Sequence, residues 1–485
     1  MDRLTGLEPK EVFRYFEEIC GIPHGSGNTK AISDYLVSEA KKLGLEYGQD
    51  DMGNVLIRKP AYPGYENQSP VILQGHMDMV CEKRQDLAHD FEKDGLNLGI
   101  TDGYIHASGT TLGGDDGIAV AMMLALLEDK TAKHPALEAL FTVDEEIGLL
   151  GAAGFDTDIL KGKRMINLDS EEEGDLWVSC AGGLTGITHL PVTYEAREGR
   201  KVNVKVCGLM GGHSGAEIDK GRASACKIMA GLLLRMEKEL SFTPAIIYVG
   251  GGSKDNAIPR ECTASLLLSE ESQLQEIEDV VRLYEEEKRK EYTGTDEGIR
   301  IITEPSLWGE EKILTPASRT IVLFYLNQMP FGIQKMSGTI PGLVETSLNP
   351  GIVRLDQEEL YVSYGIRSSV NAAKEELSDK VAFLTEFLGG EYETQGRYPA
   401  WEYREESELR NVMQKVYSDL FGGELKVVAM HAGLECGIFY QKIENLDCVS
   451  IGPEILDIHT SEERMNIASV QRTYRFLKEV LRVLS

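Results

Sequence analysis

Short apolar runs in this chain end in side chains that can bind a metal ion. The runs are PVILQG, LEALFTV, MINL and VSIGPEILDI, and the polar residues that follow them are His76 and Asp78, Asp144 to Glu146, Asp169, and His459. Ligands of open α/β sheets collect beyond the carboxyl ends of the strands, so these groups could meet at one edge of a sheet. Imidazole and carboxylate donors without sulfur suit zinc, with manganese and cobalt as alternatives. The pattern predicts a metal-dependent reaction centre.

Each of these residues also has a purely structural interpretation. A single histidine at a strand end is usually a hydrogen-bonded structural residue, and an aspartate before a helix, as Asp115 is in TLGGDDGIA, is often an N-cap. Adjacent glutamates in a loop usually face solvent. The same donor types recur at successive strand ends, which favours the metal site. His76 and Asp78 are two apart and share one side of an extended strand, where Asp78 could orient the imidazole.

The segments that must position these groups have an α/β pattern at both ends of the chain. Up to about residue 182, helical spacing in EVFRYFEEIC and KAISDYLVSEAKKLG precedes the apolar runs, and the apolar helix DDGIAVAMMLALLED falls between two of them. After about residue 399 helices and strands alternate again, and SVQRTYRFLKEVLRVL closes the chain. We therefore expect one catalytic domain with a mixed sheet, made of residues 1–183 and 399–485.

Residues 184–398 have a different pattern, which predicts an inserted α+β domain. Alternating strands such as RKVNVKVCG flank the helix ASACKIMAGLLLRMEKEL, and a second round of helix, paired strands and helix follows. An internal structural duplication is one interpretation of this repetition. Insertion within a domain is tolerated because chain termini usually lie close together at the surface.

Composition argues against several classes of function. The chain has 485 residues, of which 79 are acidic and 50 basic, and its formal charge of -29 disfavours binding to nucleic acid or anionic lipid. Its eight cysteines form no CxxC pair, so neither a disulfide framework nor a cysteine metal site is indicated. The polar N-terminus lacks a signal-peptide pattern, and no window reaches the roughly 18 apolar residues of a membrane helix. We expect a cytoplasmic protein with no nucleic-acid or membrane partner.

Taken in order, several segments resemble a known peptidase family. They are GHMDM at 75–79, GGDDG at 113–117, DEEIG at 144–148, NLDSEEEG at 167–174 and DIHT at 457–460. This set is similar to the co-catalytic dinuclear zinc peptidases related to carboxypeptidase G and tripeptidase. TLGGDDGIA, VSCAGG, GLMGGHSG and HAGLECG further resemble the bacterial aminoacyl-histidine (Xaa-His, carnosinase-like) dipeptidase branch. Many relatives have Asp-x-Lys where this chain reads Asp115, Asp116 and Gly117, which argues against the carboxypeptidase branch.

The resemblance implies a fold, a metal site and a general base. The implied fold is α/β, with a mixed-sheet zinc-peptidase catalytic domain and an inserted α+β lid and dimerisation domain. Asp115 would bridge two divalent ions, Zn²⁺ first and Mn²⁺ or Co²⁺ as alternatives. The other ligands would form two pairs: His76 with Asp169, and Glu146 with His459. Glu145 would be the general base, and Asp78, beside the His76 imidazole, would be a second catalytic residue. The family also has a cis peptide bond at the position between Asp115 and Asp116.

The same resemblance implies that the inserted domain supplies substrate contacts. His213, in the glycine-rich GLMGGHSG, would stabilise the carbonyl oxyanion, although spacing alone is explained equally well by a glycine-rich turn. Arg367 in YGIRSS and Asn256 in KDNAIPR are candidates for binding the substrate carboxylate. A homodimer formed through this domain is also implied. His431 and Glu435, in HAGLECG, could line the substrate pocket or belong to a structural polar loop.

The main hypothesis is a metal-dependent dipeptidase that cleaves unblocked dipeptides, notably Xaa-His substrates such as β-alanyl-histidine. One alternative is a di-metal amidohydrolase that removes the acyl group from N-acyl amino acids with the same metals. Another is a non-catalytic binding protein with the same fold, which predicts the loss of at least one ligand, yet every ligand residue is present. The predicted partner is a small peptide substrate.

Overall fold

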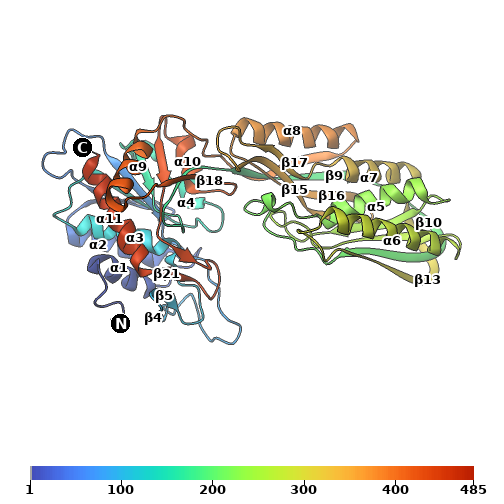
Figure 1. The fold of residues 1–485 in the computed structure, drawn as a ribbon, viewed down its shortest axis with the longest axis horizontal. Helices are drawn as coiled ribbons and strands as arrows, with labels where there is room; N and C mark the ends of the chain where they lie inside the picture. The colour runs from blue at the N-terminus through green and yellow to red at the C-terminus, as the bar shows by residue number, and fades with distance from the viewer. Residues whose placement is uncertain (1–2, 485) are drawn as a thin grey trace. The chain divides into compact units, whose positions relative to one another are not determined.

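The computed structural model describes residues 3–484, which divide into two compact units. Unit 1 comprises residues 1–180, 401–429 and 434–485, and unit 2 comprises residues 181–400 and 430–433. Figure 1 shows the chain entering unit 2 after its first third and returning to unit 1 near its C-terminal end. Both ends of the chain therefore contribute to the same unit.

The main sheet of unit 1 is mixed and positions the predicted ligands. Its strand order is β1-β2-β6-β3-β7-β19-β8-β18. The strands are β1 (Glu46–Gln49), β2 (Val55–Lys59), β3 (Val71–His76), β6 (Leu137–Thr142), β7 (Arg164–Asn167), β8 (Asp175–Cys180), β18 (Lys426–Met430) and β19 (Asp447–Ser450). Strand β3 runs parallel to both β6 and β7, and β7 runs parallel to β19. The carboxyl ends of these central strands therefore lie at one edge of the sheet.

Helix α3 (Gly114–Glu128) lies in the hydrophobic core of unit 1. Every residue from Ile118 to Leu127 is at most 3% exposed. A helix that is apolar on all sides must be covered on all sides, and α1 (Lys10–Cys20) packs against it (Figure 1). The other helices of this unit are α2 (Lys30–Leu43), α4 (Leu150–Gly154), α9 (Glu408–Phe421), α10 (Glu435–Lys442) and α11 (Ile467–Val483). The buried helix gives a fixed base to its own first turn, where Asp115 has a non-helical backbone conformation.

A small antiparallel sheet of unit 1 carries the C-terminal histidine. Its order is β20-β21-β5-β4, formed by β4 (Leu98–Thr101), β5 (Tyr104–Ala107), β20 (Ile455–Leu456) and β21 (Arg464–Asn466). His459 lies in the turn between β20 and β21 and has a positive φ of 60°. The turn is closed by the Thr460 hydroxyl, which donates to the carbonyl of Asp457 at 2.7 Å.

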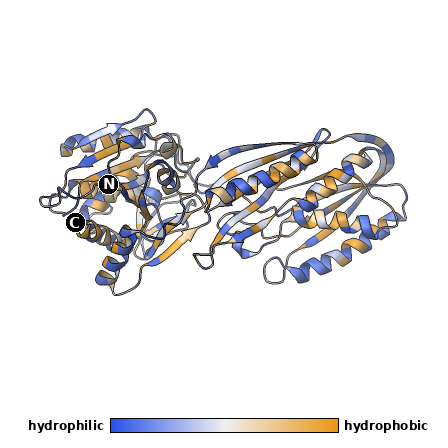
Figure 2. Cartoon of the chain, turned by 90° about the horizontal axis from the view of Figure 1, so that it is seen from above, coloured by the Kyte–Doolittle hydropathy of each residue, from blue (hydrophilic) through white to orange (hydrophobic). Residues whose placement is uncertain are grey.

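Unit 2 is built on one antiparallel sheet with its own hydrophobic core. The order is β13-β10-β12-β11-β15-β16-β9-β17, with β14 paired to β15. The strands are β9 (Gly182–Pro191), β10 (Tyr194–Cys207), β11 (Ala245–Gly251), β12 (Cys262–Leu268), β13 (Arg300–Leu314), β14 (Gly332–Met336), β15 (Val344–Leu355), β16 (Glu359–Ser368) and β17 (Glu391–Tyr398). The helices are α5 (Ala225–Glu239), α6 (Gln273–Glu291), α7 (Pro316–Gln328) and α8 (Asn371–Phe387). Figure 2 shows hydrophilic and hydrophobic residues mixed along these helices, as one-sided packing requires.

The mixed α/β architecture predicted from the sequence is confirmed. Within residues 3–484, no helix combines the length and the apolar character needed to span a membrane.

Candidate metal centre

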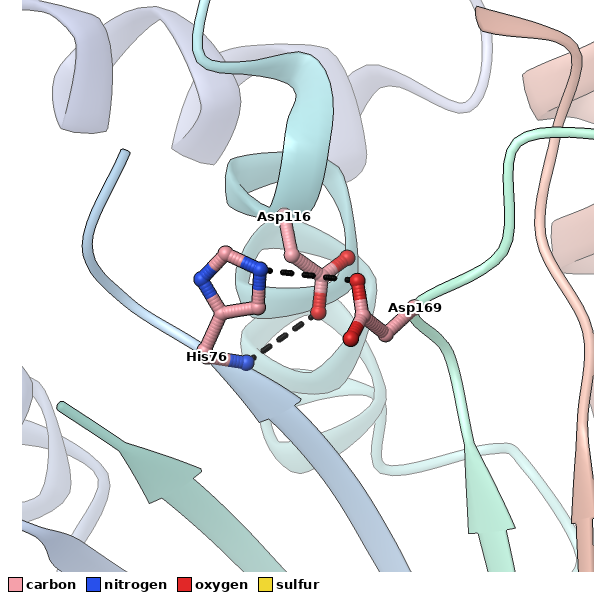
Figure 3. A group of neighbouring side chains, drawn as sticks. All are labelled: His76, Asp116 and Asp169. Atoms are coloured by element: carbon pink, nitrogen blue, oxygen red, sulfur yellow. Dashed lines mark hydrogen bonds and ion pairs between the residues drawn. The ribbon is translucent and has the colours of Figure 1, made fainter. Parts of the chain in front are cut away.

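The predicted ligands of the first ion lie at the ends of neighbouring strands of unit 1. His76 is the last residue of β3, and Asp169 comes two residues after the end of β7. The register pairs Gln74 of β3 with Asn167 of β7, so the two strands end side by side. As a result, the His76 Nε2 atom lies 3.4 Å from Asp169 Oδ1 (Figure 3).

Asp115 lies between two histidines. Its Oδ1 is 3.1 Å from His76 Nε2, and its Oδ2 is 3.1 Å from His459 Nε2. The same His459 atom is 2.9 Å from Glu146 Oε1. Each oxygen of one carboxylate therefore faces a different imidazole, which is the arrangement that a bridging ligand needs. The cis peptide bond expected between Asp115 and Asp116 is present.

The donor set fits divalent cations. Donor atoms of Asp115, Glu146 and His459 lie within 4.8 Å of one another, as do those of His76 with Glu145 and Glu146. Asp116 groups in the same way with His76 and Asp169. Figure 3 shows, however, that its carboxylate accepts a hydrogen bond from the His76 backbone N–H at 3.1 Å. Imidazole nitrogen and carboxylate oxygen without thiolate match zinc or a similar metal.

The carboxylates of this cluster favour positive charge at His76 and His459. Burial alone would lower the pKa of His76, but the Asp169 carboxylate and the hydrogen bond with Asp115 raise it well above its ordinary value. Hydrogen bonds with Asp115 and Glu146 raise the pKa of His459 to about 11. The carboxylates therefore favour the charged form of both imidazoles, whereas a metal ion binds the neutral form.

Glu145, the predicted base, sits beside this cluster on the loop after β6. Burial raises the pKa of its carboxyl well above the ordinary value. Its backbone N–H donates to Asp78 Oδ1 at 3.0 Å, and the Asp78 Oδ2 accepts from the Ser26 hydroxyl at 2.8 Å. Asp78 Oδ1 is also 3.4 Å from His76 Nδ1. The fully buried Asp78 therefore joins the imidazole of one ligand to the loop that carries the base.

Asp144, which has no predicted role, is a structural residue of the same loop. Its φ is 54°, and its Oδ1 accepts a hydrogen bond from the Gly27 backbone N–H at 2.7 Å. This contact joins the loop after β6 to the segment that precedes α2. The Asp144 carboxylate thus binds the Gly27 backbone, whereas the Glu146 carboxylate faces His459.

Two buried glutamates near these ligands have contacts that sequence patterns do not reveal. Glu435 Oε2 accepts from Gln74 Nε2 at 2.5 Å and from the Thr142 hydroxyl at 2.6 Å, and Asn167 Nδ2 donates to Gln74 Oε1 at 2.7 Å. This chain of hydrogen bonds crosses β6, β3 and β7 just before the strands end. The second residue is Glu463, four positions after His459. Burial raises the pKa of the Glu435 and Glu463 carboxyls to about 7.

In unit 2, His213 is held as a defined neutral tautomer. The backbone N–H groups of Gly215 and Ala216 donate to its Nδ1 atom at 3.2 and 2.9 Å, so the ring proton belongs on Nε2. Burial and the nearby Arg367 guanidinium lower the pKa of His213. The imidazole is therefore uncharged near neutral pH and offers an N–H donor.

Arg367 and His431 lie near His213 in unit 2, whereas within residues 3–484 no hydrogen bond joins the Asn256 side chain to them. Arg367 Nη1 donates to the Tyr398 hydroxyl at 2.8 Å, and its Nε has no hydrogen-bond partner within residues 3–484. His431 Nε2 lies 2.7 Å from the hydroxyl of Ser347, and burial lowers the pKa of this histidine to about 3. Asn256 is exposed and contacts the His213 loop through its backbone carbonyl, which accepts from the Ser214 N–H at 2.8 Å.

Comparison with known proteins agrees with this geometry. Residues 72–483 match the model of peptidase family M20/M25/M40. The chain is 36% identical to the cytosol non-specific dipeptidase of Escherichia coli (strain K12), over 99% of each chain. It is also similar to the crystal structure of aminoacylhistidine dipeptidase from Vibrio alginolyticus, with a TM-score of 0.92 and 34% identity over 99% of this chain and 98% of that one.

A more distant structure shares the fold. Aminopeptidase PepT from Bacillus cereus has a TM-score of 0.56 and 16% identity, with 99% of each chain covered. The family resemblance found in the ordered motifs is confirmed, and the chain belongs to peptidase family M20/M25/M40.

Proposed function

We propose that this protein is a metal-dependent dipeptidase that hydrolyses unblocked dipeptides, notably Xaa-His substrates such as β-alanyl-histidine. The observation that carries the proposal is Asp115, whose two oxygens face His76 and His459. The dipeptidases to which the chain is similar along nearly its whole length support the choice of substrate.

Two divalent ions, Zn²⁺ first and Mn²⁺ or Co²⁺ as alternatives, would be held by the donor set described above. Asp115 would bridge them, with His76 and Asp169 completing one site and Glu146 and His459 the other. Bound ions of this kind lower the pKa of water and polarise a carbonyl oxygen. All five side chains have their donor atoms within reach of this arrangement.

Glu145 would act as the general base and then as the general acid. Its carboxylate would take a proton from the attacking water and deliver it to the leaving amine as the peptide bond breaks. Asp78 supports this role because it fixes the Glu145 backbone and contacts His76. A carboxyl whose pKa is raised by burial is suited to hold a proton between those two steps.

Unit 2 would supply contacts to the substrate. His213 would donate its Nε2–H to the oxyanion that forms from the scissile carbonyl, and Arg367 would bind the terminal carboxylate with its planar fork. Asn256 would assist with that carboxylate. The free Nε of Arg367 and the fixed tautomer of His213 support these roles.

We further propose that the protein is a cytoplasmic homodimer formed through unit 2. The similarity to a cytosol dipeptidase supports the location. Light scattering on the purified chain tests the assembly, since a mass equal to one chain would contradict it.

A substrate panel tests the proposed reaction. The purified zinc-loaded enzyme is assayed with unblocked dipeptides, including β-alanyl-histidine, and with N-acetyl and N-benzoyl amino acids. We expect hydrolysis of the dipeptides and little turnover of the acylated compounds. Cleavage of the N-acyl compounds alone would favour the amidohydrolase, and no turnover with either set would favour a binding protein.

A further inference from the structure

Glu463 makes an unusual set of contacts with the backbone of unit 1. Its side chain is 2% exposed. Oε2 accepts from the N–H groups of Leu112 and Gly113 at 2.8 and 3.2 Å, and Oε1 accepts from those of Gly114 and Asp115 at 2.9 and 3.4 Å. One carboxylate therefore serves four successive backbone donors at the start of α3.

The local sequence permits this close approach. A Cβ atom on Gly114 would lie only 3.3 Å from Glu463 Oε1, so a side chain there would press on the carboxylate. Gly113 has a φ of 65°, a conformation that favours glycine. The N–H groups at a helix start have no partner within the helix, and negative charge is favoured there. Gly114 thus leaves room for the carboxylate, and Gly113 provides the positive φ before the helix.

The same residue is tied to the loop of His459. Glu463 immediately precedes β21, which pairs with β5 and β20 in the small sheet. Its own N–H donates to the carbonyl of Thr460 at 3.2 Å, the residue after His459. The carboxylate therefore joins the segment that carries one proposed ligand to the backbone N–H of another, Asp115.

We infer that Glu463 is a positioning residue that sets Asp115 against His459 so that both can bind the same metal ion. Within residues 3–484 it makes no hydrogen bond or ion pair with the His459 imidazole or the Asp115 carboxylate. It acts through the backbone of one ligand and the loop of the other. The inference rests on the proposed function only in taking Asp115 and His459 as metal ligands.

The test measures metal affinity directly. The wild-type apoprotein, Glu463→Gln and the control Glu462→Gln are titrated with Zn²⁺ in competition with a chromophoric chelator, and thermal unfolding of each apoprotein is followed. Glu462 is the exposed neighbour of Glu463, so its substitution removes the same charge from the surface. A glutamine at 463 would turn an NH₂ group toward backbone N–H donors. We expect zinc affinity to fall roughly 10- to 100-fold in Glu463→Gln and to stay unchanged in the control.

Two further variants keep the test decisive if Glu463→Gln folds poorly. Gly114→Ala displaces the carboxylate without changing any charge, and Glu463→Asp keeps both oxygens on a shorter side chain. We expect both to weaken zinc binding, by less than the glutamine substitution, while the apoprotein remains folded. Unchanged zinc affinity in these folded variants, with a lower unfolding temperature alone, would show that Glu463 serves only stability. Because no substrate is used, failure of the dipeptidase assignment would leave this result intact.

Discussion

The candidate site histidines of the two units have opposite electrostatic surroundings. In unit 1, His76 and His459 face carboxylates, which raise the pKa of both imidazoles. In unit 2, burial and the Arg367 guanidinium lower the pKa of His213 and His431. The surroundings therefore favour positive charge at His76 and His459 and the neutral, hydrogen-bonding form of His213 and His431. Environment rather than residue type assigns the role.

The largest effect is expected within unit 1, where Glu145 and Glu146 differ in role. Glu145→Gln removes the proposed base but no ligand, so kcat should fall roughly 10²- to 10⁴-fold while the metal content stays at the wild-type level. Metal analysis and steady-state kinetics on one preparation check both points.

Glu146→Gln is the matched control, because it changes the neighbouring carboxylate in the same way. It should reduce the metal content itself, since Glu146 lies 2.9 Å from His459. Equal metal content in the two variants would show that their roles have been assigned wrongly.

In unit 2, removal of the His213 donor should cost less. His213→Gln is expected to lower kcat roughly 10²- to 10³-fold without altering metal content, as loss of one oxyanion donor does elsewhere. His189→Gln serves as the control, because that histidine pairs with Glu359 at 2.8 Å and has no proposed role. A loss of bound metal in His213→Gln would contradict the proposal that unit 2 contacts the substrate and not the metal ions.

A smaller effect on the kinetics is expected when the side chain at position 367 changes its shape but keeps its positive charge. Arg367→Lys keeps the positive charge but loses the planar fork, so KM should rise roughly tenfold to a hundredfold with metal content unchanged. Arg354→Lys, at an exposed position of β15, is the control. An unchanged KM would mean that Arg367 does not bind the substrate carboxylate.

The smallest effect is expected at Asp144. Asp144→Asn keeps an oxygen that can accept from Gly27, so kcat should stay within about threefold of wild type and metal content should not change. A loss comparable to that of Glu145→Gln would show that all three carboxylates of this loop take part in the reaction.

The strand-end ligands could be predicted because parallel strands end at one edge of a sheet. His76 and Asp169 meet for that reason. His459 was also predicted from a strand end, but it lies in the turn between β20 and β21 of the small sheet. The family motifs assigned Asp115 and His459 their roles as ligands. Glu463 could not be predicted, because its partners are backbone N–H groups about 350 positions earlier, and backbone atoms leave no trace in side-chain patterns. The division of the chain into domains at 183 and 398, and any internal duplication, remain predictions.

We propose that the paired oxygens of Asp115 build a two-ion site on which hydrolysis depends. Metal analysis of one purified sample, before and after chelation and with the dipeptide assay run in parallel, tests it most directly. We predict about two divalent ions per chain, loss of activity when they are removed, and recovery on addition of Zn²⁺. A metal-free preparation that hydrolyses dipeptides at the full rate would contradict the claim.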